Sequence, residues 1–150
     1  MWLTASLSLS LIAAQPASDA LVERQCPWLP IFFDNGTTQL DDAARSQMDS
    51  GGFLWFRSLE GGGDTHIVLR TYTQGEPMPD VGRLSEARAD AVRAALIERH
   101  IPPDHIMISH TYGHQLQMAD EHWVGGWVYP EYYVTRAFND RWFGPGAPLC

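Results

Sequence analysis

Residues 83–100 read RLSEARADAVRAALIERH, and this stretch decides the fold. It contains neither Gly nor Pro, and Ile101-Pro102-Pro103 follows, so the pattern predicts a helix that ends near residue 100. At about 100° per residue, one face of the helix collects the apolar side chains of Leu84, Ala91, Val92, Ala95 and Leu96. We expect that face to pack against the rest of the protein.

Two arginines, Arg88 and Arg99, lie in the middle of this apolar face. Arg99 is in the last turn, where a cation reaches water and meets the negative end of the helix dipole. Arg88 is in the second turn, so its guanidinium needs an anionic partner. That partner is either a ligand or an internal carboxylate, for which Asp34 and Asp80 are the candidates.

Composition limits the class of protein. The 150 residues suit one domain with a single core. There are 10 basic residues, all Arg, against 18 acidic ones, giving a net charge of −8. Such a balance argues against a nucleic-acid or anionic-membrane surface. A small acidic ligand remains compatible with it, because one arginine in a cleft is enough to bind a carboxylate.

The N-terminus has the pattern of an export signal. Residues 1–20 are apolar or small apart from Gln15 and Asp19, and the apolar run is too short to span a bilayer. We therefore expect cleavage after Ala20 and an exported mature chain of residues 21–150 without a transmembrane segment. In an exported chain, Cys26 and Cys150 are expected to form a disulfide that joins the two ends.

Strand and turn signals complete the fold. We expect strands at 28–33, 66–72, 106–112 and 131–138, and a first helix at about 40–48. Residues 53–59 favour a helix weakly. The order β-α-β-α-β-β predicts a two-layer α/β sandwich, with a mixed sheet and both helices on one face.

Three motifs resemble those of the OmpA-like, peptidoglycan-associated domain family over about residues 28–138. Residues 33–40, FDNGTTQL, resemble the family's entry into its first helix, and residues 84–92, LSEARADAV, match its Leu-Ser-x-x-Arg-Ala-x-x-Val helix. The third is IPPDHI at 101–106, followed by Tyr112-Gly113. In this family the helix arginine binds a carboxylate of the diaminopimelate residue in the peptidoglycan stem peptide, a role that falls on Arg88 here.

The chain departs from the family pattern around this arginine. The family's Gly-His-Thr-Asp at the end of the second strand is replaced by residues 70–73, RTYT, so Thr73 stands in place of the aspartate. Glu76 or Asp80 is expected to replace the lost carboxylate. The ligand-binding residues predicted from the sequence are Arg88, Thr73, Asp34, Asn35, Glu76 and Asp80. Two partners stay open: peptidoglycan, or an envelope protein bound by a fold that has lost peptidoglycan binding.

The sequence contains no motif typical of catalysis, of a cofactor site or of a known metal site. No Gly-x-Ser-x-Gly, phosphate-loop or His-Glu-x-x-His motif occurs, so we expect neither an enzyme nor a cofactor. The six histidines motivate a weaker alternative, a metal-binding protein in which His105, His110 and His114 converge. The aromatic residues between Trp123 and Tyr133 either pack in the core or form a platform for a partner.

Overall fold

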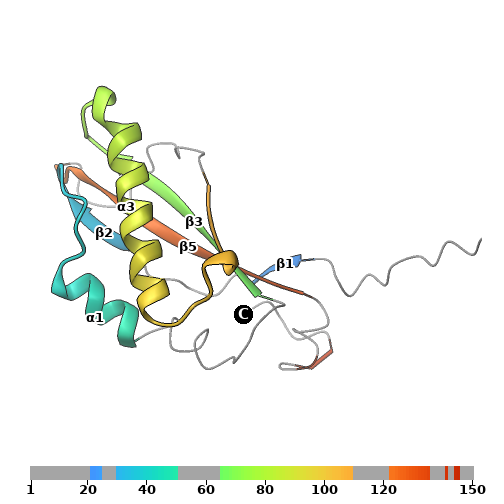
Figure 1. The fold of residues 1–150 in the computed structure, drawn as a ribbon. Coiled ribbons are helices and arrows are strands. Elements are labelled where there is room, and N and C mark those ends of the chain that lie inside the picture. The colour runs from blue at the N-terminus through green and yellow to red at the C-terminus, as the bar shows by residue number, and fades with distance from the viewer. Residues whose placement is uncertain are drawn as a thin grey trace, which may run out of the picture.

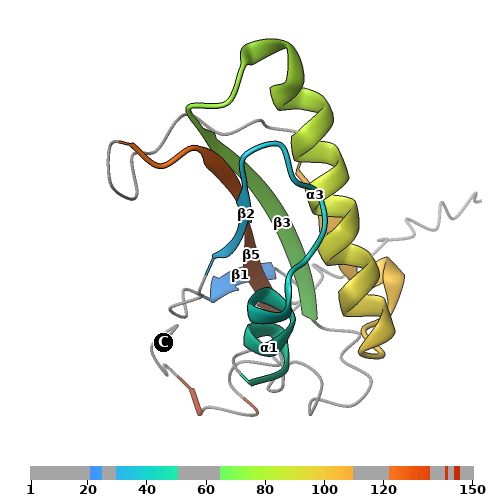
Figure 2. The ribbon, with the colours of Figure 1, turned by 90° about the vertical axis from the view of Figure 1, so that its left-hand side faces the viewer.

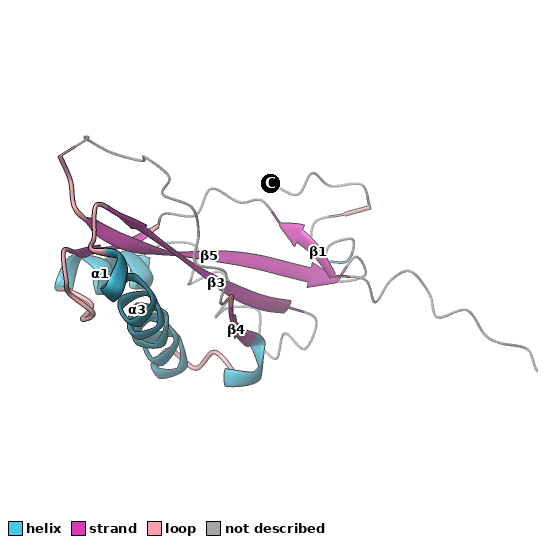
Figure 3. Ribbon diagram, turned by 90° about the horizontal axis from the view of Figure 1, so that it is seen from above, coloured by secondary structure: helices cyan, strands magenta, loops and turns pink. Residues whose placement is uncertain are grey.

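The computed structural model describes residues 21–24, 30–50, 65–109 and 122–135, together with 141, 144 and 145. A five-stranded mixed sheet forms one layer, and helices α1 (Asp42–Ser50) and α3 (Met78–Glu98) form the other. Both helices cover the same face of the sheet (Figure 3). The predicted two-layer α/β sandwich is confirmed.

Strand β5 (Gly125–Thr135) is the centre of the sheet. Along one edge it pairs antiparallel with β2 (Ile31–Asp34) and with β1 (Leu21–Arg24), each at a different end. Along its other edge it pairs antiparallel with β3 (Thr65–Gln74) over ten residues. The short strand β4 (Ile106–Ile108) lies parallel to β3 at the margin (Figures 1 and 2).

The core lies between the helices and one face of the sheet. Alternate residues of each strand point inward because successive side chains of a strand face opposite sides. Ile67 and Leu69 of β3 are buried in this way against Val92 and Leu96 of α3. The helix side of the core also contains Ala95, Met48 and Ala44, as the apolar stripes of the two helices predict.

Local hydrogen bonds fix the helix ends. Asp41 accepts a 2.7 Å bond from the backbone N–H of Ala44 and so caps α1. At the C-terminal end of α3, His100 adopts a positive φ of 67°. Its N–H bonds to Ile97 O, and the N–H of Ile101 bonds to Leu96 O, which is the Schellman pattern that usually has glycine at this position.

Several predicted boundaries were wrong. The main helix begins at Met78, not at Arg83, because Pro79 is accommodated in its first turn. The last strand begins at Gly125, not at residue 131, so residues 125–130 are strand where a loop was expected. Strand β1 was not predicted. Arg99 behaves as expected, since it bonds to Asp49 and to the carbonyl of Ala95 at the end of the helix.

Some expectations concern residues that the structure does not describe. The leader 1–20, the segment 53–59, His110, His114 and both cysteines, Cys26 and Cys150, lie outside the described ranges. The export signal and the disulfide therefore remain predictions. Among the helices of the described residues, none has the length and apolar character needed to cross a bilayer.

Candidate functional site

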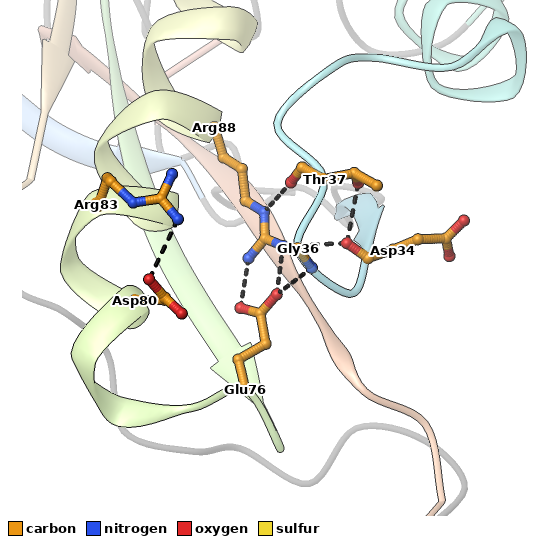
Figure 4. A network of polar contacts seen from close by, with 7 residues as sticks. All are labelled: Asp34, Gly36, Thr37, Glu76, Asp80, Arg83 and Arg88. Atoms are coloured by element: carbon orange, nitrogen blue, oxygen red, sulfur yellow. Dashed lines mark hydrogen bonds and ion pairs between the residues drawn. The ribbon is translucent and has the colours of Figure 1, made fainter.

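Arg88 is almost completely buried where α3 crosses the sheet, with only 1% of its surface exposed. Its helix position directs the side chain at the β2–α1 loop and at the first residues of β5 (Figure 4). The guanidinium carbon lies 5.5 Å from the centre of the Phe33 ring, within the range of a cation–π contact. The apolar face predicted from the sequence therefore does carry an enclosed positive charge.

The anionic partner of this charge is Glu76. Its two carboxylate oxygens accept hydrogen bonds from Arg88 Nη2 at 2.5 Å and Nη1 at 2.7 Å, the two-pronged geometry that makes arginine–carboxylate pairs strong. Glu76 Oε1 also accepts a 3.1 Å bond from the backbone N–H of Gly36. None of the Glu76 side chain is exposed to solvent.

Glu76 is held in place by a very short connection. Only Gly75, Glu76 and Pro77 link the end of β3 to the start of α3. Gly75 has a φ of +72°, a left-handed conformation that glycine adopts without strain. The tight link therefore fixes the carboxylate next to the arginine on the following helix.

The remaining guanidinium donors bind the loop that joins β2 to α1. Arg88 Nε donates to Thr37 O at 2.8 Å, and Nη2 donates to Asp34 O at 3.1 Å. The same Asp34 carbonyl accepts from the N–H and the hydroxyl of Thr37, each at 2.9 Å. Arg88 thus joins three segments: the loop, the β3–α3 link and its own helix.

Gly126 makes room for the guanidinium. It pairs with Phe33 on one side and Thr73 on the other, and a Cβ atom built on it would overlap Arg88 Nη1 and come within 2.8 Å of Tyr72 O. Gly126 was not among the residues predicted from the sequence. A Gly-Gly pair at the start of a strand-forming segment is a known sign of close approach, and it was the available signal.

The arrangement has a clear chemical consequence. An arginine buried with a two-pronged partner has little to offer a ligand, because a second carboxylate must first displace the internal one. The displaced Glu76 would then need another partner or water, since a buried unpaired charge is costly. In this conformation the site is a closed ion pair.

The other predicted ligand residues lie in different surroundings. Thr73 is buried at 5% exposure in the same cross-strand row as Gly126. Asp34 and Asn35 are exposed on the loop, and Asp34 contacts Arg88 through its backbone carbonyl. Asp80 pairs with Arg83 at 3.2 Å on the surface, so the expectation that Asp34 or Asp80 would supply the internal carboxylate for Arg88 was wrong.

A hollow of about 440 Å³ borders the β2–α1 loop on its outer side. Phe32, the loop residues Asp34, Gly36 and Thr37, and the capping residue Asp41 are among those lining it. Neither Arg88 nor Glu76 belongs to its lining. Arg88 therefore shapes this hollow only indirectly, by holding the two loop carbonyls.

The described ranges contain no group of three or more His, Cys, Asp or Glu side chains arranged to hold a metal ion. Of the three histidines expected to converge, only His105 is among the described residues. The sequence-based convergence is therefore untested.

Comparison with protein families identifies the family of this chain. The model of a family described as the OmpA family matches residues 32–122. This range contains α1, β3, α3, β4 and all of β2 except Ile31, and with them every residue of the Arg88 pair and its loop. A search of curated proteins finds no match.

Proposed function

This chain belongs to the OmpA family, and from that membership together with its closed ion pair we propose that it is a periplasmic envelope module that binds a protein partner. Domains of this family are peptidoglycan-associated in general. In our proposal Arg88 keeps a structural role in this member and does not grip diaminopimelate. The role is one of binding, without catalysis or a cofactor.

The observation that carries the proposal is the burial of Glu76 against Arg88. A ligand carboxylate competes with the carboxylate of Glu76, which is tethered two residues after the end of β3, and such a group acts at an effective concentration of about millimolar or above. Glu76 is held in place by a further hydrogen bond, which its carboxylate accepts from the backbone N–H of Gly36. Loss of the family aspartate at Thr73 removes the charge that would bind the ammonium of the ligand.

The partner surface we propose is the aromatic cluster formed by Phe32, Tyr72, Trp123 and Trp127. Trp127 is buried, and Tyr72 stacks on it with ring centres 5.5 Å apart. Phe32 packs on Trp127 and edge-on against Trp123 at 5.7 Å, yet it keeps 45% of its surface exposed. Exposed aromatic groups on a rigid support are typical anchors of protein interfaces.

Binding to diaminopimelate tests the role of Arg88. We expect no saturable binding of free diaminopimelate by calorimetry, and equal retention on purified sacculi of the wild type and an Arg88→Lys variant. The Thr73→Asp variant, which restores the family aspartate, is expected to behave like the wild type because Glu76 still occupies the arginine. Saturable binding by the wild type that is lost in Arg88→Lys would contradict the proposal.

The aromatic surface needs its own test. Phe32→Ser and Ile97→Ser each remove one exposed apolar side chain, from β2 and from α3 respectively. With a photo-crosslinker placed next to the aromatic cluster, we expect the wild type to crosslink to one envelope protein. This crosslink should disappear in Phe32→Ser and persist in Ile97→Ser. Unchanged crosslinking in Phe32→Ser would argue against this surface. Cell fractionation of the tagged full chain tests the periplasmic location.

A further inference from the structure

His66 and His105 lie side by side at the β3–β4 end of the sheet. The two strands are parallel, with Ile67 opposite Ile106, and each histidine precedes one of these residues. Ile67 and Ile106 face the core, so His66, which alternates with Ile67, points to the far face, away from the helices. The His105 ring lies beside it, with ring centres 5.3 Å apart and planes tilted by 46°.

Both histidines have a buried nitrogen without a partner. Nδ1 of His66 and Nδ1 of His105 are inaccessible to solvent, and neither makes a hydrogen bond. Buried polar atoms are nearly always bonded, so each exception calls for an explanation. The two rings are adjacent, so one partner shared by both nitrogens would account for the two exceptions together.

We propose that His66 and His105 together bind a single divalent transition-metal ion of the class that favours imidazole, namely Cu²⁺, Ni²⁺ or Zn²⁺. Two imidazoles that bind one ion at about 2.0–2.1 Å, in a roughly tetrahedral arrangement, have ring centres about 5 Å apart. The observed separation of 5.3 Å agrees with this geometry. The proposal is independent of the envelope partner described above.

The protein supplies two ligands at this place, because no third His, Cys, Asp or Glu among the described residues completes a cluster. The nearby carboxylate of Glu131 is already used by Arg70 at 2.6 Å and by the Tyr133 hydroxyl at 3.0 Å. Water or a small anion therefore fills the remaining coordination positions, which requires the two rings to turn toward solvent, because both nitrogens are inaccessible in this conformation. Such an open site suits an exchangeable ion rather than a structural one.

The surroundings leave space for those ligands. A hollow of about 480 Å³ on the far face is lined by His66, Val68, Arg70, Met107, Ile108, Ser109 and Tyr133. Of the β3 side chains that line the hollow, His66 lies at one end and Arg70 at the other. An ion held by His66 is thus next to a space that solvent and small anions can enter.

The site is tested by titrating the untagged full chain with Cu²⁺, Ni²⁺ and Zn²⁺ in a non-chelating buffer. We expect the wild type to bind one equivalent of metal ion with a saturable isotherm. In both His66→Gln and His105→Gln the affinity for the ion should fall by more than about tenfold. His100→Asn is the matched control, because His100 is exposed just after the end of α3 and has a left-handed backbone that Asn tolerates. This variant should bind the metal ion like the wild type.

Three results would overturn the proposal: no saturable binding by the wild type, equal binding by all four proteins, or loss in only one of the two variants. A second measurement uses the wild type alone and so does not depend on variant folding. Diethylpyrocarbonate labelling read by mass spectrometry should show metal-dependent protection of His66 and His105 together, and not of His100. Absence of joint protection would equally reject the shared site and leave a bridging water as the partner of the two nitrogens.

Discussion

Each carboxylate oxygen of Glu76 accepts a hydrogen bond from a different guanidinium nitrogen of Arg88, which lies twelve residues further along the chain. Both side chains are enclosed. An enclosed pair of this kind adds little net stability compared with apolar residues of similar size, but removing one member is costly. The pair is therefore best recognised by what happens when it is broken.

Replacing Glu76 by glutamine should lower the free energy of unfolding by about 3–5 kcal/mol, because Arg88 would stay charged and lose its counter-ion. Urea denaturation monitored by tryptophan fluorescence measures this. The exposed ion pair of Asp80 and Arg83 provides the comparison. Asp80→Asn should cost less than about 1 kcal/mol. A similar small cost for Glu76→Gln would show that the Arg88 pair is not enclosed in solution.

Gly126→Ala should destabilise the fold by about 1–3 kcal/mol through overpacking, because the new methyl group collides with Arg88 and with the carbonyl of Tyr72. The collision with Arg88 can be separated from the collision with the Tyr72 carbonyl by repeating the substitution in a background that carries Arg88→Met and Glu76→Met. There Gly126→Ala should destabilise the fold less, because only the collision with the carbonyl remains. A cost that does not change with the background would mean that Arg88 does not lie over Gly126.

His100→Gly should raise the free energy of unfolding by about 0.5–1 kcal/mol, since His100 holds a left-handed conformation at the end of α3 that glycine adopts without strain. Thermal unfolding would register this as a higher melting temperature. His100→Val, which makes the left-handed backbone harder to reach, should have the opposite effect. Equal melting temperatures for the three proteins would contradict the observed helix end.

Tyr132 should make the protein sensitive to alkali. Its burial raises the pKa of the phenol well above the usual value of 10.0, so the folded state keeps the proton that the unfolded state releases. The stabilising contribution is complete below the unfolded pKa and is lost as the pH rises toward the folded one. Denaturation between about pH 9 and 11 should show a steeper loss of stability for the wild type than for Tyr132→Phe. Parallel curves would indicate that the phenol is not enclosed.

The sequence predicted the layers of the fold because periodicity and chain punctuation are local signals. The apolar stripe of residues 84–96 predicted the main helix and most of its buried face, although Ala91 is only partly buried and Ala89, which was not predicted, is fully buried. Its start was missed because Pro79 was interpreted as part of a loop, whereas proline is tolerated in a first helical turn. The early start of β5 was missed because Gly125 and Gly126 lower strand propensity. Glycine is needed there because the Phe33 carbonyl and the Arg88 side chain, both distant in sequence, leave no room for a Cβ atom.

For the candidate site, the sequence identified Arg88 as an enclosed cation and named Glu76 among the residues around it. It did not predict that Glu76 is the internal partner of Arg88. That assignment depends on the direction of a three-residue link, which is set by the left-handed Gly75 and by the N–H of Gly36 forty residues away. The His66–His105 neighbourhood was likewise invisible, because it arises from the register of two parallel strands.

The central place of β5 has a consequence for how this protein is made. The strand that joins β1 and β2 to β3 is encoded after all of them, close to the C-terminus. A ribosome-bound chain that has not yet reached residue 125 has two halves of a sheet with no strand to connect them. The domain is therefore expected to acquire its tertiary structure only after β5 has been synthesised, however early the other strands and both helices leave the ribosome.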